Sequence, residues 1–283
     1  MSEVGPVFPV LETWSEYRRH MEWVDGEGGL WTSGHGQYPS VETERLSART
    51  ITVPPCHFGI PVAGECENTY VGIEGCIEVV LEDDRAFTLG PRDVLRLCSG
   101  TPHHLSNYTF SHSLVARISG RLPQKLTGEF PNVEYLRWEE YKRAITWGVP
   151  LAERWGMHRG QAPYVTSEVM KGHTCIQPSG QSCPWHGTSR DLIFVGLSGS
   201  TEFAAAGQSW TLGTADLLIL PGNTPYKYSN YDPETAVFFD IGSIHGAGTE
   251  DPPTRFYFER DPGWPVDFDT PELETEFSAG QRK

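Results

Sequence analysis

The sequence predicts an all-β protein made of two similar domains, with a short helix leading into each. Three observations support this prediction. The chain repeats itself over most of its length. Short runs of Val, Ile, Leu and Phe recur between turn residues, a pattern typical of a sandwich or barrel. The 283 residues include 30 glycines and 22 prolines, which suits turn-rich β structure, and the length leaves room for two domains.

The repeat is clearest at tryptophan, because this residue is rare and its copies stay in register. An offset of 124 maps Trp138, Tyr141, Trp147, Trp155, Gln161 and Pro163 onto Trp14, Tyr17, Trp23, Trp31, Gln37 and Pro39. After Gly199 one residue is lost, and an offset of 123 maps Asn230 onto Asn107. A period this long indicates duplicated domains rather than a solenoid. We therefore expect domains at 1–125 and 126–250, followed by an acidic aromatic tail at 251–283.

Each copy is expected to begin with an amphipathic helix, at 11–23 and at 139–147, followed by a loop and then by strands. Apolar runs predict strands in the first copy at 45–53, 68–73, 76–81, 93–97 and 113–119. The second copy has strands predicted at 167–170, 173–176, 192–195, 200–203, 216–220 and 236–241. We expect the lead-in of each copy to cross over to the other copy. The first part of the tail is expected to pack across a domain surface, and its end, from 272, to be disordered.

The charge of the chain argues against two classes of partner. The formal net charge is -15 and the lysines and arginines form no cluster, so neither nucleic acid nor an anionic membrane surface is expected to bind. No apolar run is long enough to span a membrane, and the N-terminus lacks the basic and apolar regions of a signal peptide. We expect a cytoplasmic protein whose six cysteines are reduced and form no nucleophilic Cys/His pair.

A stretch of the second copy resembles the two motifs of the cupin family. Where the first family motif places glycine, two histidines, glutamate and glycine, this chain has Gly180, His186, Thr188, Leu192 and Gly199. Where the second places glycine, proline, glycine, histidine and asparagine, it has Ala215, Pro221, Asn223, Tyr226 and Asn230. Together with the repeat, this spacing identifies the chain as resembling a bicupin. The resemblance implies two jelly-roll barrels, a ligand cavity inside, and a possible homodimer.

In the family, the histidines and the glutamate of the motifs hold a metal, and Fe, Mn, Ni or Zn suits such ligands. Here His186 is the best candidate ligand in the second copy, and His103 in the first, where the other positions are Val62, Gly64 and Asn68. A catalytic metal normally needs about three protein ligands. Three interpretations stay open. In the first, the cavity is metal-free. In the second, a different set of residues holds the metal (His186 with Asp191, His173 or Tyr226). In the third, the protein binds a ligand without catalysing a reaction.

His186 and Tyr226 are the predicted catalytic pair, because both take motif positions that face the cavity. Imidazole titrates near neutrality and phenol well above it, which suits general acid–base catalysis. The predicted substrate contacts are Thr188, Asp191, His173 and Trp185. Asp191 precedes the glutamate position by one residue, so a strand would turn it to the opposite face. Like its counterpart Glu67, Asp191 also fits a structural role at a strand edge.

The first copy is expected to be the structural one. The match to His173 there is taken as Thr50, which is not ionisable, and the inner positions are taken as apolar apart from His103, with the adjacent His104 on the surface. The second copy keeps more groups that carry chemistry. We therefore place the candidate active site in the C-terminal barrel.

These features predict an enzyme that acts on a small organic metabolite without redox chemistry, by isomerisation, cyclisation, dehydration or decarboxylation. One alternative is a metal-dependent dioxygenase, which bound metal would favour. Another is a non-catalytic small-molecule binding protein, which would keep its ligand in a His186→Ala variant and show no turnover.

Overall fold

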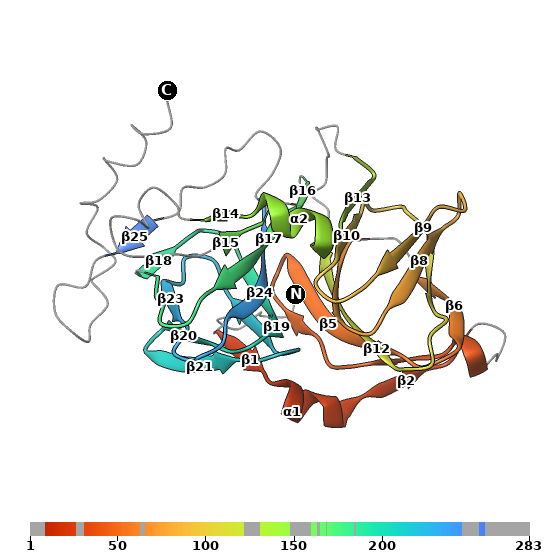
Figure 1. Cartoon of the computed structure of the whole chain (residues 1–283), viewed down its shortest axis with the longest axis horizontal. Coiled ribbons are helices and arrows are strands. Elements are labelled where there is room, and N and C mark those ends of the chain that lie inside the picture. Colours follow the sequence, from red (N-terminus) through yellow and green to blue (C-terminus); the bar gives the residue numbers. More distant parts are fainter. Residues whose placement is uncertain are drawn as a thin grey trace, which may run out of the picture.

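The computed structural model describes residues 9–26, 31–62, 66–121, 131–147, 160–162, 165–167, 169–183, 185–244 and 255–257. Strands dominate these residues and form two barrels that lie side by side, each built from one large and one small antiparallel sheet (Figure 1). The predicted all-β fold is confirmed.

In the N-terminal barrel, the large sheet runs through β13 (Val133–Leu136), β10 (Val94–Leu97), β7 (Glu67–Glu74), β12 (Ser113–Gly120), β5 (Leu46–Val53), β3 (His35–Gln37) and β2 (Glu22–Val24). A further strand, β4 (Val41–Glu42), pairs with β5. The small sheet runs through β6 (His57–Val62), β11 (His103–Asn107), β8 (Ile77–Leu81) and β9 (Ala86–Leu89).

In the C-terminal barrel, the large sheet runs through β1 (Val10–Glu12), β22 (Leu217–Leu220), β19 (Leu192–Ser198), β24 (Ala236–Ser243), β17 (Met170–Gln177), β15 (Gly160–Gln161) and β14 (Thr146–Trp147). A further strand, β16 (Val165–Thr166), pairs with β17. The small sheet runs through β21 (Gln208–Leu212), β20 (Thr201–Ala205), β23 (Tyr226–Ser229), β18 (Trp185–Gly187) and β25 (Arg255–Tyr257).

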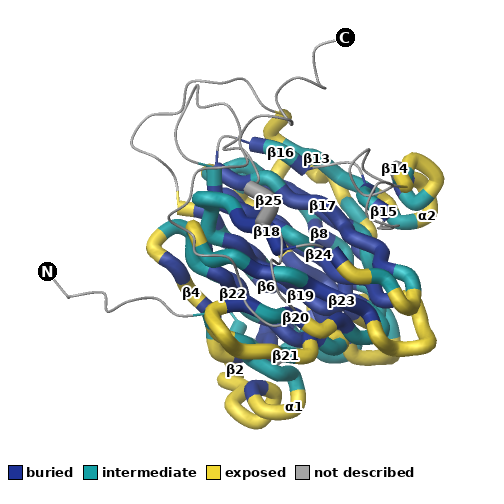
Figure 2. Tube along the Cα trace, turned by 90° about the vertical axis from the view of Figure 1, so that its left-hand side faces the viewer, coloured by how far each residue is buried: buried dark blue, intermediate teal, exposed yellow. Residues whose placement is uncertain are grey.

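The large sheets are buried on both faces, and the alternation of side chains along a strand decides what each face meets. In β5, Leu46 and Ala48 belong to a core shared by the two barrels, whereas Ile51 belongs to the interior of the N-terminal barrel. In β19, Ile193 faces the shared core and Phe194 faces the C-terminal interior. Burial on both faces explains the near-continuous apolar runs, and Figure 2 shows that exposed residues gather at the turns and the short helices.

The first strand of each copy pairs with the other barrel, which confirms the predicted crossover. β1 pairs with β22, and β13 pairs with β10. The helices that follow, α1 (Trp14–Tyr17) and α2 (Trp138–Tyr141), begin with matching contacts. The backbone N–H of Trp14 donates to Asp216 Oδ1 at 2.6 Å, and that of Trp138 donates to Asp93 Oδ1 at 2.6 Å.

Two buried tyrosines repeat a second contact between the halves. The hydroxyl of Tyr17 bonds Thr50 of its own barrel at 2.7 Å and donates to the carbonyl oxygen of Ala215 in the other barrel. Tyr141 makes the matching pair of bonds, to Thr174 and to the carbonyl oxygen of Arg92. The two copies therefore share not only their strand order but the side chains that join them.

Gly72 and Gly196 lie where a turn closes directly over the sheet. A Cβ added at Gly196 would stand 1.7 Å from the carbonyl oxygen of Gly213, and one added at Gly72 would stand 1.9 Å from that of Gly90. The neighbouring atoms are backbone atoms, which cannot move aside as a flexible side chain could. Both positions therefore require glycine.

The helices are shorter than the sequence predicts. α1 passes through a 3-10 turn (Arg18–His20) into β2, and α2 passes through a 3-10 turn (Lys142–Ala144) into β14. Each short strand then pairs with a sheet edge, and this pairing competes with continuation of the helix. The strands predicted separately at 167–170 and 173–176 are also wrong, because 170–177 form the single strand β17.

Part of the predicted tail returns to the C-terminal barrel, since β25 pairs with β18, as expected. The end of the tail from 272, Trp155 and Pro163 lie outside the described residues. The domain boundaries at 125 and 250 stay a prediction, and β13 lies beyond the first of them in sequence while pairing with the N-terminal sheet. Within the described ranges, no helix has the length and apolar character needed to cross a membrane.

Candidate functional site

The interior of the C-terminal barrel is rich in aromatic side chains. Its buried cluster, here called the C-terminal interior, contains Cys175, Cys183, Leu192, Phe194, Phe203, Ala205, Leu212, Leu218, Leu220, Tyr226, Tyr228 and Phe238. Ring centroids of Tyr228 and Phe238 lie 5.3 Å apart, and those of Tyr228 and Phe203 lie 5.4 Å apart. Walls of this kind suit the apolar body of a small organic molecule, which a few polar groups then orient.

The predicted catalytic pair meets in this interior. His186 of β18 and Tyr226 of β23 are register partners on neighbouring strands. Their ring centroids lie 4.2 Å apart with the planes tilted by 52°, and the two residues are 5% and 4% exposed. The ring of His186 also meets Tyr228 edge-on at 5.7 Å. An imidazole and a phenol are therefore held in contact, with tilted planes, in an apolar surrounding.

A cysteine thiol lies beside this pair. Cys183 Sγ lies 3.8 Å from His186 Nδ1 and accepts a hydrogen bond from the backbone N–H of Tyr228 at 3.1 Å. A thiol that donates to Nδ1 places the imidazole proton on Nε2. The sequence spacing gives no sign of this contact. That the cysteines form no nucleophilic pair with a histidine stays a prediction.

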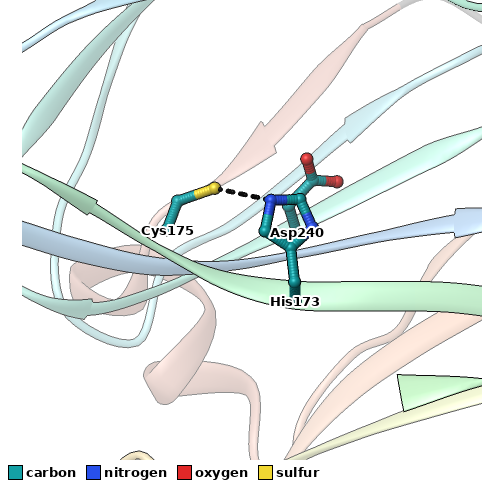
Figure 3. A group of neighbouring side chains, drawn as sticks. All are labelled: His173, Cys175 and Asp240. Carbon is teal, nitrogen blue, oxygen red and sulfur yellow. Dashed lines mark hydrogen bonds between the residues drawn. The ribbon is translucent and has the colours of Figure 1, made fainter. Parts of the chain in front are cut away.

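A second group of polar side chains lies on the large sheet of the same barrel (Figure 3). His173 and Cys175 alternate on β17 and share a face, and Asp240 of β24 is the register partner of His173. His173 Nε2 lies 3.1 Å from Cys175 Sγ and 3.2 Å from Gln161 Nε2. One possible ligand atom from each of His173, Cys175 and Asp240 lies within 4.8 Å of the others. Imidazole, thiolate and carboxylate together suit Zn or Fe.

Three predicted substrate contacts lie elsewhere. The carboxylate of Asp191 accepts a hydrogen bond from the backbone N–H of Gly222 at 2.9 Å, which fits the structural role. The Thr188 hydroxyl meets the backbone N–H of Arg190 at 3.4 Å. Trp185 alternates with His186, and its ring lies beside Lys227 on the other face of the small sheet. Only His173 among the predicted substrate contacts shares the inner face with Cys175.

Comparison with known proteins agrees with the fold described above. The sequence profile of the cupin domain family matches residues 172–242, from β17 to β24. Residues 172–242 form a cupin domain. No curated protein sequence matches the chain.

Two solved structures resemble the whole fold. AerE from Microcystis aeruginosa is 12% identical with a TM-score of 0.59, over 84% of this chain and 98% of that chain. A mutant of salicylate 1,2-dioxygenase from Pseudoaminobacter salicylatoxidans in complex with gentisate is 13% identical with a TM-score of 0.64, over 85% and 84%. These likenesses extend well beyond the cupin domain, and at such identities they show the fold alone.

The cupin domain lacks the metal-binding residues that its motifs carry in the family. Leu192 takes the glutamate position and is buried in the C-terminal interior, where it offers no ligand atom. His186 and Tyr226 are then the remaining motif donors with suitable atoms. Two donors fall short of the roughly three that a catalytic metal needs. The usual metal site of the family therefore does not fit this cupin domain.

The candidate ligand of the N-terminal barrel is also engaged. His103 Nδ1 donates to the carbonyl oxygen of Thr101 at 2.8 Å, and its Nε2 lies 2.7 Å from the hydroxyl of Tyr70. Burial lowers the pKa of His103, so its ring is neutral at pH 7. Metal binding there would require one of these bonds to break. His104 is exposed, as predicted.

The prediction of an apolar N-terminal interior is wrong. The counterpart of His173 in the cupin domain is Arg49 and not Thr50, because Gln161 pairs with Cys175 as Gln37 pairs with Ile51. Thr50 turns to the opposite face of β5, toward Tyr17 of the shared core. Arg49 and Arg117 of the neighbouring strand β12 share the inner face.

Sequence reasoning missed Cys175, Asp240, Arg49 and Arg117. A signal was present for three of them, since each is the one charged residue inside an otherwise uncharged strand: Arg49 in β5, Arg117 in β12 and Asp240 in β24. A charge in a strand that is buried on both faces has to point into a barrel or across an interface. Cys175 carried no such signal, because a buried cysteine usually behaves as a small apolar residue.

Proposed function

We propose that the C-terminal barrel binds a small organic molecule and transfers protons to and from it without net oxidation. His186 acts as the general base or acid, and Tyr226 donates a hydrogen bond or the second proton. The observation that carries this proposal is the direct opposition of these two buried side chains, with ring centroids 4.2 Å apart. Two groups that titrate in different ranges can serve as base and acid on one substrate.

The surroundings support the same role. Phe194, Phe203 and Phe238 supply apolar walls, so water competes little with a bound substrate and each polar contact gains in strength. The contact of Cys183 with His186 Nδ1 orients the imidazole. Cys183 is a positioning residue in this scheme, since it acts through His186.

The proposal fits a group of reactions that all require a proton to be moved to or from the substrate. Isomerisation removes a proton from one atom and returns it to another. Dehydration and decarboxylation remove water or carbon dioxide from a substrate that an acid or base has polarised, and cyclisation moves a proton as the ring closes. None of these steps changes the oxidation state of the protein or consumes dioxygen. His186 and Tyr226 would carry the proton transfers in each of these reactions.

The test uses a soluble metabolite extract from the source cells and mass spectrometry. Wild-type protein is expected to convert one compound to a product of the same mass, or to one that lacks water or carbon dioxide. Conversion should continue without dioxygen and in the presence of a chelator, and should fail in His186→Ala. Uptake of isotopically labelled dioxygen into the product would refute the non-redox proposal.

A metal-dependent enzyme is the second candidate, favoured by one observation. His173, Cys175 and Asp240 supply three ligand types close to one another on the inner face of the large sheet. Three protein ligands with an open fourth position is the usual composition of a catalytic zinc site. A metal held there would lie outside the family motif and would supply Lewis-acid or oxygen chemistry to the same interior.

The remaining features of the proposal are less specific. Binding of a small-molecule substrate follows from either candidate. A homodimer and a cytoplasmic location stay predictions. The non-catalytic alternative is tested by the same variant, since a binding protein would retain its ligand in His186→Ala and show no turnover in the wild type.

A further inference from the structure

Two arginines lie side by side on the inner face of the N-terminal barrel. Arg49 of β5 and Arg117 of β12 are register partners, and Tyr70 of β7 continues the row on the other side of Arg117. Paired residues of antiparallel strands point to the same face of the sheet. Ile51 and Val115, two positions further along the same strands, belong to the interior cluster of this barrel. Both guanidinium groups therefore face the barrel interior.

Neither charge of this pair has an ion-pair partner within the part of the chain that the structure describes. Like charges directly opposite each other on neighbouring strands destabilise a sheet. Burial, and then the charge of Arg117, lower the pKa of Arg49. The acids that act on Arg49 are Glu42 and Glu22, which are exposed on the adjoining strands.

The polar groups beside Arg49 add donors. Arg49 Nη1 donates to Gln37 Oε1 at 2.6 Å, and Gln37 Nε2 lies 2.7 Å from His35 Nε2. An amide NH2 group can only donate, so His35 accepts at Nε2 and carries its proton on Nδ1. His35 is 6% exposed, and its Nδ1 has no hydrogen-bond partner within the described part of the chain. The buried Nε of Arg117 also has no hydrogen-bond partner among the described residues.

The other end of the row supplies no negative charge. His103 donates through Nδ1 to a carbonyl oxygen, so its Nε2 accepts the proton of the Tyr70 hydroxyl. Arg117 in turn bonds that hydroxyl. Burial raises the pKa of Tyr70 to about 12, so the phenol stays neutral. The row from Arg49 to His103 is thus rich in donors and positive charge.

We propose that this row is a binding site for an oxyanion, the carboxylate or phosphate group of a small molecule, held by Arg49, Arg117 and His35. Guanidinium groups present planar N–H forks that match such groups. The unpartnered N–H groups of His35 and Arg117 would gain acceptors, and the like charges would gain a counter-charge. Both arginines are partly exposed, so solvent reaches the site. The site lies in the barrel that the proposed proton transfer does not use.

The test measures binding of inorganic phosphate and of malonate, separately, to the full chain in chloride-free buffer. Calorimetry and the shift of the thermal unfolding midpoint serve as readouts, and neutral malonamide is the control ligand. The variants are Arg49→Met and Arg117→Met. Arg85→Met is the matched control, since Arg85 makes an exposed ion pair with Asp83. His186→Ala controls for binding in the C-terminal barrel.

We expect phosphate, malonate or both to bind the wild type, Arg85→Met and His186→Ala alike, with affinity about tenfold or more weaker in Arg49→Met and Arg117→Met. Binding of phosphate alone would assign the site to phosphate esters, and binding of malonate alone to carboxylates. Without ligand, both methionine variants should be at least as stable as the wild type, because the repulsion is removed. The proposal is overturned if neither anion binds, or if both methionine variants bind as the wild type does. Loss of oxyanion binding in His186→Ala would also overturn it, because the anion would then lie in the other barrel.

Discussion

His173 and Arg49 occupy the same position in the two barrels, yet each faces a different partner. His173 of β17 lies opposite Asp240, whereas Arg49 of β5 lies opposite Arg117. One barrel therefore has an acid beside an imidazole, and the other has two cations. The same scaffold carries interiors of different chemistry, and the predictions below treat them separately.

The pair in the C-terminal interior is expected to carry turnover. His186→Ala should lower kcat by about 10²–10⁴-fold, since general acid–base catalysis contributes this much. Tyr226→Phe, which keeps the ring and removes the hydroxyl, should lower kcat while leaving the fold intact. Product formation from the active metabolite is the measurement. Trp185→Phe is the control, because its ring lies on the opposite face of the strand, and an equal loss there would point to damage of β18 instead.

The group around His173 is expected to bind metal if the second candidate function holds. Protein purified without an affinity-tag metal should then contain close to one equivalent of Zn or Fe by elemental analysis. Cys175→Ser and Asp240→Asn should lose it. Cys183→Ser is the matched control, since Cys183 is another buried cysteine of the same interior. Metal that is absent from the wild type, and not taken up on dialysis against Zn or Fe(II), would remove this candidate.

The crossing tyrosines should contribute to stability. Tyr17→Phe leaves Thr50 and the carbonyl oxygen of Ala215 without their buried partner, at a cost of about 1–3 kcal/mol in the free energy of unfolding. Tyr141→Phe should cost a similar amount. Urea unfolding provides the measurement, with the exposed Tyr108→Phe as the control. A change no larger than that of the control would show that the bond across the halves adds nothing.

Gly196→Ala should be among the most damaging single changes, at about 3 kcal/mol or more, because its Cβ would strike the carbonyl oxygen of Gly213. Gly207→Ala isolates the effect of positive φ, since Gly207 has φ +75 and open space around it. That control should cost about 1 kcal/mol. Comparable losses in the two variants would contradict the close approach.

Acid should destabilise the N-terminal barrel through His35. Burial, and then the charges of Arg117 and Arg49, lower the pKa of His35 from 6.5 to about 4. The unfolded chain therefore takes up a proton at a pH where the folded chain does not. The contribution of neutral His35 is complete above pH 6.5 and is lost as the pH falls toward 4, by on the order of 3 kcal/mol.

The measurement for His35 is the free energy of unfolding between these pH values. Wild-type stability should fall more steeply with acid than that of His35→Gln, which cannot titrate. Parallel curves for the two proteins would mean that His35 is protonated in the folded state as readily as in the unfolded one.

The sequence predicts the arrangement of this protein better than its chemistry. Trp14 and Trp138, kept in register by the repeat, indicated two similar domains, and the apolar runs of β5 and β19 predicted strands. The register was harder to read. A slip of one residue exchanges the two faces of a strand. Because Thr50 was taken as the match to His173 in place of Arg49, the wrong face of β5 was assigned to the barrel interior. Neither arginine was therefore predicted to lie there.

The candidate site shows the same limit. The motif spacing brought His186 and Tyr226 together correctly, because both lie within one continuous stretch of sequence. Asp240 lies far along the chain from Cys175, and only the pairing of β24 with β17 joins them. Contacts between distant strands depend on register, which composition and spacing do not specify.

The exchange of edge strands has a consequence for how such a chain can change over time. β1 completes the sheet of the C-terminal barrel, and β13 completes that of the N-terminal barrel. Neither half can be deleted without leaving an open edge on the other, which invites pairing with further chains. Each half is thus retained for what it gives its partner, whatever its own interior does. Under that constraint, either interior is free to lose an old set of ligands and gain a new one.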